Sequence, residues 1–167
     1  MKKWKVADDC FVYILRNNLT HLIEKIVKDF KLDARFVATL FAHKLKYCEG
    51  HLNSSQPFDY KSVYNLIKFV KDSNLENEIL KKMLPIYYEH PQMEMGSILR
   101  TTGYKEVSKK SILDEAEKLK GMFNNIRYKH NKSETAETDW IMGNIKPIAL
   151  GNMSLAELRK EVDKIIT

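Results

Sequence analysis

The residues whose charges could do chemistry are concentrated in one segment of this chain. Between Arg100 and Lys132 there are nine Lys or Arg residues and four Asp or Glu residues, a surplus of +5 in a chain whose net charge is +6. Such a surplus attracts polyanions, because contacts to phosphates release condensed counterions. The segment therefore makes nucleic-acid binding a candidate function, with a set of merely solubilising lysines as the alternative.

Residues that could catalyse a reaction or hold a metal are not spaced for either task. We find no Ser/His/Asp, Cys/His or paired-carboxylate arrangement, and the adjacent acids Asp8 and Asp9 point to different faces of a helix. No glycine-rich phosphate loop occurs. The sequence therefore predicts no catalytic site in this chain alone. The histidines lack ligand spacing, so it predicts no metal site either; they are His21, His43, His51, His90 and His130.

Composition and length indicate the class of protein. Apolar residues make up 44% of the chain and charged residues 30%, which is typical of a soluble globular protein. No apolar run approaches the ~20 residues needed to cross a bilayer, and no signal-peptide core follows the basic N-terminus. Cys10 and Cys48 lie far apart, which favours a reduced cytosolic pair, with a disulfide as the alternative. We expect a cytoplasmic protein with no membrane contact.

The elements that must position the charged segment are helices. Apolar residues recur at three- and four-residue spacing almost everywhere, which predicts an all-α fold. The pattern predicts a first helix over residues 9–30, and a second helix that Asp33 caps and Gly50 ends. Residues 51–58 form a polar loop, and Asp59 caps a third helix.

The second half of the chain continues the helical pattern. We expect a helical bundle subdomain over residues 1–104 and a small helical tail subdomain over residues 105–167. The predicted elements are a helix that Pro85 kinks or shortens, a short helix at 93–101, a long helix capped by Ser108, a polar linker at 131–138, a helix at 139–150, and a helix at 155–166 that begins with a Ser154–Glu157 capping box.

The order of several short motifs resembles a known family. They are NLIKFV (65–70), ILKKM (79–83), MEMGSIL (93–99), GYK (103–105), the long helix at 108–123, and the stretch 140–151, in which Gly143 and Gly151 lie eight residues apart. Over roughly its last two thirds the chain resembles the C-terminal helical and tail (GatB/YqeY) region of the GatB/GatE subunits of tRNA-dependent amidotransferases. The collinear order and the glycine spacing carry the resemblance.

The resemblance implies a role in amide formation on tRNA. Subunits of this family act in converting Glu-tRNA(Gln) or Asp-tRNA(Asn) to the correct amide, which is a carbon–nitrogen ligase reaction. The ATP and Mg²⁺ would belong to a separate cradle domain, and no part of this chain resembles a cradle. The implied role of the chain is to grip tRNA, not DNA, beside the amidotransferase core and its glutaminase/asparaginase-type subunit.

The resemblance also implies which residues face the tRNA. A diffuse basic face suits RNA, because RNA helices are read by shape and backbone contacts. The candidates are Lys105, Lys109, Lys110, Lys118, Lys120, Arg127, Lys129 and Lys132. The alternative is that Asp114 and Lys118 form an ordinary i,i+4 pair and that several others only solubilise the helix. We expect the phosphate contacts to come mainly from the long Ser108 helix and its flanks.

The tail carries a second set of marked residues. Pro147 cannot donate to the carbonyl of Gly143, which predicts a kinked or interrupted helix, either as a surface against the tRNA elbow or as a packing device. Asn152 stands after Gly151 where the family often has a basic residue, and it can adopt a left-handed turn. Trp140 is expected in the core or at a docking surface, with base stacking as the alternative.

Two other functions compete with tRNA binding. A protein-interaction module could dock a partner through Phe36, Phe41 and Phe69, and an independent enzyme is the least favoured reading. The cluster of Tyr87, Tyr88 and His90 at a helix end is expected to be structural, with a pocket as the alternative. A free-standing relative of the family is a further possibility.

Overall fold

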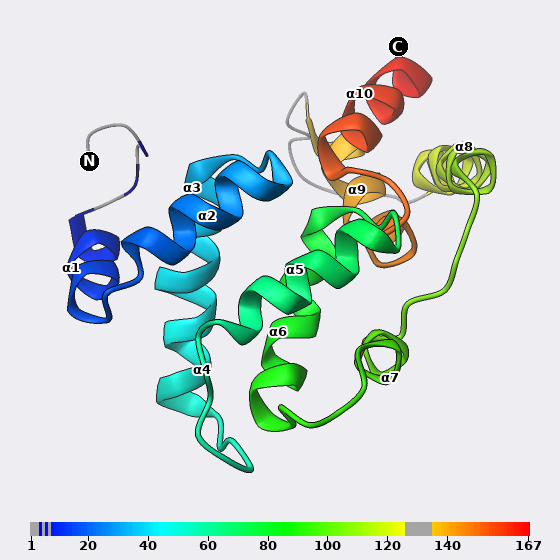
Figure 1. Cartoon of the computed structure of the whole chain (residues 1–167). Coiled ribbons are helices and arrows are strands. Elements are labelled where there is room, and N and C mark those ends of the chain that lie inside the picture. Colours follow the sequence, from blue (N-terminus) through cyan, green and yellow to red (C-terminus); the bar gives the residue numbers. More distant parts are fainter. Residues whose placement is uncertain (1–3, 5, 7, 126–134) are drawn as a thin grey trace. The chain divides into compact units, whose positions relative to one another are not determined.

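The computed structural model describes residues 4, 6, 8–125 and 135–167, and this part of the chain is helical without strands (Figure 1). The all-α prediction is therefore confirmed. The chain forms two compact units: an N-terminal unit of Met1–Asn74 and Ile79–Thr102, and a C-terminal unit of Leu75–Glu78 and Gly103–Thr167. None of the described helices is both long and apolar enough to span a bilayer.

The N-terminal unit packs its helices around one apolar core. Helix α6 contacts η2, α5 and α7, helix α2 contacts α3 and α5, and helix α1 contacts η2. Ile23, Phe41, Leu66 and Met83 are fully buried in that core. The elements are α1 (Asp8–Arg16), α2 (Thr20–Phe30), α3 (Ala34–Thr39), the π-helical η2 (Leu40–Leu45), α4 (Lys46–His51), α5 (Ser62–Asp72), a 3₁₀ turn η3 (Asn77–Ile79), α6 (Leu80–Glu89) and α7 (Met95–Thr101).

The predicted single helix over residues 9–30 is wrong, because the chain breaks after α1. Asn18 adopts a left-handed conformation with φ of 53°. The Asn18 N–H donates to the Leu15 carbonyl and the Leu19 N–H to the Ile14 carbonyl, which is the pair of bonds of a Schellman motif. The break changes the helical phase, so Ile14 of α1 is buried and Leu15 is 48% exposed.

The second predicted helix is one helical run with a π-helical insert. Asp33 caps it as expected, since its Oδ1 accepts the Phe36 N–H at 2.9 Å. The run continues through η2 and α4 to His51, so Gly50 lies inside the last turn and does not end it. The π-helical stretch was not predicted, because π turns have no sequence signature as clear as a cap.

The remaining predictions for the N-terminal unit hold in part. Asp59 Oδ1 accepts the Lys61 N–H at 2.9 Å in the turn that leads into α5, but the N-cap of the helix is Lys61 and no side chain caps it, so the predicted Asp59 cap is displaced into the preceding turn. Helix α6 runs through Pro85 to Glu89, so the proline neither ends it early nor removes its last turn. Both buried cysteines, Cys10 and Cys48, are outside any disulfide, in agreement with the reduced reading.

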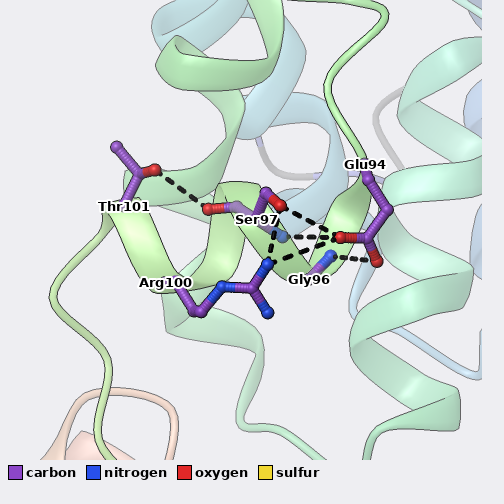
Figure 2. Close-up of polar contacts among 5 residues, drawn as sticks. All are labelled: Glu94, Gly96, Ser97, Arg100 and Thr101. Carbon is purple, nitrogen blue, oxygen red and sulfur yellow. Dashed lines mark hydrogen bonds and ion pairs between the residues drawn. The ribbon is translucent and has the colours of Figure 1, made fainter.

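The short helix α7 begins at a carboxylate cap, which Figure 2 shows. Glu94 Oε1 accepts the Gly96 N–H at 3.1 Å, and Oε2 accepts the Ser97 N–H at 3.0 Å. A Cβ on Gly96 would lie 2.9 Å from Glu94 Oε1, so the carboxylate uses the space that the glycine leaves. The MEMGSIL motif is thus explained locally by helix capping.

The described residues of the C-terminal unit form a three-helix bundle. Helices α8 (Lys109–Asn125), α9 (Ala136–Ala149) and α10 (Leu155–Ile166) pack against one another pairwise. The buried side chains come from all three helices and include Ile112, Ala116, Ile141, Ile145, Leu158 and Val162. Ser108 Oγ accepts the Ser111 N–H at 3.2 Å and begins α8 as expected.

Two predictions for the tail need correction. Thr138 was placed in a linker, but it lies inside α9, is buried, and donates to Asp163 Oδ1 at 3.0 Å. Residues 131–134 of that linker lie outside the described part of the chain. The Ser154 side chain accepts the Glu157 N–H, but the Glu157 carboxylate binds Lys109 of α8, so the capping box is half formed.

Candidate nucleic-acid surface and side-chain clusters

Five of the eight basic candidates lie in the described part of the chain, and three of them already have partners. Lys109 Nζ donates to Glu157 Oε1 at 3.0 Å, and Lys118 Nζ pairs with Glu115 Oε2 at 3.1 Å. Lys120 Nζ donates to the Ile165 carbonyl at 2.5 Å. The last three candidates, Arg127, Lys129 and Lys132, lie outside the described residues.

Lys105 and Lys110 are the candidates that the structure leaves most available. Both side chains are exposed, and within the described ranges neither forms an ion pair. Lys105 belongs to the segment that leads into α8, and Lys110 lies in the first turn of that helix. An anion that approaches this end of α8 would meet both lysines together with the helix N-terminus.

Helix α8 itself is close to electrically neutral. It carries four lysines against Asp114, Glu115 and Glu117, so it contributes +1 to the surplus of its segment. Residues 126–132 contribute three basic residues and no acidic one. The Asp114–Lys118 pair, which was the alternative to an RNA contact, does not form; Lys118 pairs with Glu115 instead. The positive charge is therefore concentrated at the flanks of α8 rather than along it.

Gly143 and Pro147 do not interrupt their helix. Helix α9 continues from Ala136 to Ala149 through both residues, and both are exposed. A Cβ on Gly143 would meet no atom within 4 Å, so close packing does not require this glycine. Gly151 has φ of 87° and supplies the left-handed turn after α9, so Asn152 does not adopt it.

Asn152 instead joins two segments of the C-terminal unit. Its Oδ1 accepts the Tyr104 hydroxyl at 3.0 Å and the Val107 N–H at 3.1 Å. Its Nδ2 donates to the Lys105 carbonyl at 2.8 Å and to the Ile148 carbonyl at 3.0 Å. The Asn152 side chain thus fixes the backbone that carries Lys105.

The aromatic candidates prove to be packed. Trp140 is half-buried against the core of the C-terminal unit, with its ring 5.6 Å from that of Phe123, which agrees with the core reading. In the N-terminal unit Phe58 packs against Tyr87 at 5.9 Å and Tyr88 at 5.1 Å. This supports the structural reading of the tyrosine pair; His90 is exposed beyond the end of α6.

The N-terminal unit contains a hollow that the sequence did not predict. We call it the Phe36 hollow; it has a volume of about 580 Å³, and Arg35, Phe36, Leu40, His43, Tyr47 and Lys81 are among the residues that line it. Its lining is largely apolar and carries three cationic residues, Arg35, Lys44 and Lys81, against one carboxylate, Asp33. Tyr47 is 50% exposed and stacks on His51 with ring centroids 4.2 Å apart. The Phe36 hollow is formed by residues of α3, η2, α4 and α6, so no local sequence motif indicates it.

A carboxylate in the same unit is held by two phenols. The Tyr13 hydroxyl donates to Glu49 Oε2 at 2.8 Å, and the Tyr60 hydroxyl donates to Oε1 at 2.6 Å. Burial, and then the bond to Glu49, raises the pKa of Tyr13, and the same two causes raise the pKa of Tyr60 to about 12. Both phenols are neutral donors at physiological pH, so the arrangement ties α1, α4 and the turn before α5 together.

A third cluster contains ligand-type side chains. Cys10 Sγ lies 3.2 Å from His43 Nε2, and Asp9, Cys10 and His43 each offer one ligand atom within 4.8 Å of the others. Sequence reasoning missed this cluster, because His43 is 33 positions from Cys10 and only the contact between α1 and η2 brings them together.

Comparisons with protein-family models, with curated proteins and with solved structures find no match for this chain. The resemblance to the GatB/GatE family therefore stays a prediction from the sequence.

Proposed function

We propose that this chain is a tRNA-binding helical and tail module of the GatB/GatE type, which holds tRNA in the cytoplasm while a separate cradle domain carries out transamidation. The observation that carries the proposal is the +5 surplus between Arg100 and Lys132. Basic residues at this density attract the phosphate backbone, and a diffuse basic face suits recognition of RNA by shape. We infer tRNA and an amidotransferase core as the partners from the collinear motifs.

The contacts of the lysines refine which residues should bind. Lys105 and Lys110 are exposed and without ion pairs in the described part of the chain, whereas Lys109 and Lys118 already face carboxylates. Phosphate binding by a paired lysine must displace its partner, which reduces the net gain. We therefore assign the principal described contacts to Lys105 and Lys110.

The test is binding of total tRNA to the purified chain at several salt concentrations. We expect affinity to fall steeply as salt rises, because each phosphate contact contributes about −0.7 to −0.9 to the slope of log K against log salt. Duplex DNA of equal length is the matched competitor. Absence of tRNA binding at low salt would contradict the proposal.

A protein-interaction module is the second candidate, and the Phe36 hollow favours it. An acidic partner segment with an apolar side chain would match the largely apolar lining and its cations, since Arg35, Lys44 and Lys81 outnumber the one carboxylate, Asp33. Phe41, one of the expected docking residues, is fully buried and unavailable, while Phe36 and Phe69 are half-buried. Co-purification of an amidotransferase core, abolished by Lys81→Glu, in a chain without tRNA affinity would favour this second function.

A further inference from the structure

Three metal-ligand types meet where the first helix contacts the π-helical segment. Asp9 and Cys10 lie in the first turn of α1, and His43 lies in η2, which packs against α1. Each residue offers one ligand atom, and these atoms lie within 4.8 Å of one another. A carboxylate oxygen, a thiol sulfur and an imidazole nitrogen are the three donor types that Zn²⁺ takes from proteins.

We propose that Asp9, Cys10 and His43 form a binding site for one Zn²⁺ ion, with the fourth position left to water or another small ligand. Three protein ligands and one exchangeable position are the arrangement of an open zinc site rather than a closed structural one. The assignment is independent of tRNA binding, because it concerns the N-terminal unit and none of the basic candidates.

The distances suit a common ion with little movement. With Zn–S of about 2.3 Å and Zn–N of about 2.0 to 2.1 Å, sulfur and nitrogen on one tetrahedral ion lie about 3.6 Å apart. Cys10 Sγ and His43 Nε2 are 3.2 Å apart, so an ion would have to open this contact by a few tenths of an ångström. Asp9 is exposed, and its carboxylate can rotate to close the remaining gap.

The burial of Cys10 gives the metal a chemical role. Cys10 is 2% exposed, and a thiolate in such a place is costly without a neighbouring positive charge. A bound Zn²⁺ supplies that charge and makes the thiolate the stable form. Cys48 is equally buried but belongs to no such group of ligand-type side chains in the described residues, so it serves as the internal comparison.

The setting of His43 supports a functional reading of the contact. His43 lies in the π-helical segment, and π turns, which are rare, occur frequently at functional sites. The same residue lines the Phe36 hollow, next to Lys44. A small anion that enters the hollow would therefore approach a metal ligand in a lining of net positive charge.

The simpler explanation is a thiol–imidazole hydrogen bond without a metal. Cobalt substitution distinguishes a metal site from such a hydrogen bond. Co²⁺ bound to a thiolate absorbs by ligand-to-metal charge transfer, and Co²⁺ bound elsewhere does not. The whole chain is reduced, treated with a chelator, and titrated with CoCl₂ and then with ZnCl₂. We expect charge-transfer absorption that saturates at one Co²⁺ per chain and disappears when Zn²⁺ is added.

Variants assign the ligands. We expect Cys10→Ser to abolish the charge-transfer absorption, and His43→Gln and Asp9→Asn each to weaken Co²⁺ binding at least tenfold. The matched controls are His21→Gln, a fully exposed histidine, and Cys48→Ala; both should bind Co²⁺ as the parent chain does. Zn²⁺ should raise the melting temperature of the parent chain and of the His21→Gln control but not of His43→Gln.

Three outcomes would overturn the proposal: no thiolate–Co²⁺ absorption in the folded parent chain, absorption lost in Cys48→Ala but kept in Cys10→Ser, or undiminished affinity in both His43→Gln and Asp9→Asn. Circular dichroism confirms that each variant is folded. If Cys10→Ser does not fold, the two exposed ligands decide the matter, since neither His43 nor Asp9 has a buried side chain whose change would unfold the unit.

Discussion

Asn152 Oδ1 accepts a hydrogen bond from the Val107 N–H at 3.1 Å, across 45 positions of sequence. The bond fixes the segment before α8 against the turn after α9. With the Tyr104 hydroxyl and the carbonyls of Lys105 and Ile148, it completes the hydrogen-bonding capacity of the Asn152 amide. The position of the exposed Lys105 is thus set by a residue that the sequence suggested only as a turn former.

Asn152→Ala should destabilise the C-terminal unit. The substitution leaves the partly buried Val107 N–H and two carbonyls without their partner, which costs about 1 to 3 kcal/mol. Asn144→Ala is the matched control, because Asn144 is exposed and its amide makes one bond, to the Trp140 carbonyl; its effect should stay within about 0.5 kcal/mol. If urea unfolding showed the same loss of unfolding free energy in Asn152→Ala and Asn144→Ala, this role of Asn152 would be contradicted.

Asn18→Ala should lower stability while Asn18→Gly should not. Asn18 has φ of 53°, a left-handed conformation that costs alanine about 1 kcal/mol and glycine nothing. Asn74, with φ of 52° after α5, should show the same order of the two variants. Thermal unfolding checks both positions. If alanine were tolerated as well as glycine at Asn18, the break between α1 and α2 would not depend on that backbone conformation.

The bonds between Tyr60 and Glu49 should make the protein sensitive to alkali. The pKa of Tyr60 is raised from 10.0 to about 12, because burial and the Glu49 carboxylate both oppose the phenolate. The folded state therefore holds the proton longer than the unfolded state, and this contribution to stability is full below pH 10 and lost as pH rises to about 12. Tyr60→Phe should show a shallower loss of stability over this interval.

Absorbance of tyrosinate gives the direct check of the Tyr60 prediction. The parent chain should contain at least one phenol whose ionisation is delayed until the chain unfolds, and Tyr60→Phe should remove part of that delay. Tyr47 is half exposed and free of a carboxylate bond in the described structure, so Tyr47→Phe is the control. An unchanged alkaline titration in Tyr60→Phe would refute the prediction.

Glu94 should contribute stability that is lost in acid. Hydrogen bonds from the backbone of Gly96, followed by those from Ser97, hold the pKa of Glu94 below its usual value of 4.5. The stabilisation by the folded-state carboxylate is therefore present above pH 4.5 and is lost as pH falls through the lowered pKa. Glu94→Gln should reduce the melting temperature at pH 7 and have less effect at low pH. A penalty independent of pH would point to packing instead.

Lys110→Ala should weaken tRNA binding more than Lys118→Ala does. Lys110 is exposed without an ion pair in the described structure, whereas Lys118 pairs with Glu115. Loss of one phosphate contact should reduce the slope of log K against log salt by about 1. Both lysines lie on α8, and circular dichroism of the two variants checks that the helix is retained. Equal affinities across salt concentrations would remove Lys110 from the proposed surface.

Much of the fold followed from local patterns. The caps Asp33, Ser108 and Ser154 act where predicted, because a short polar side chain satisfies the free N–H groups of a helix start irrespective of the rest of the chain. The last helix, Leu155–Ile166, has its predicted limits. The break at Asn18 was missed, since apolar spacing of three and four continues across it and the left-handed turn shows only in the backbone.

The candidate sites were less predictable, because charge type is visible in a sequence and charge pairing is not. Lys105 and Lys109 look equivalent on the printed chain, yet Glu157, 48 residues later, pairs with Lys109 alone. The same limit applies to His43, which gains its neighbour Cys10 from a contact between helices. Residue spacing along one helix cannot show such partners.

The sequence by itself determined that the chain is helical, where most helices begin, and that its basic residues gather in one segment. These properties depend on periodicity, capping and composition, all of which act within a few residues. Only the tertiary structure decided which lysines of the described residues lack an ion pair, that Asn152 supports the start of α8, and that Asp9, Cys10 and His43 meet. Those relationships arise from packing between segments distant in sequence, which local chemistry does not encode.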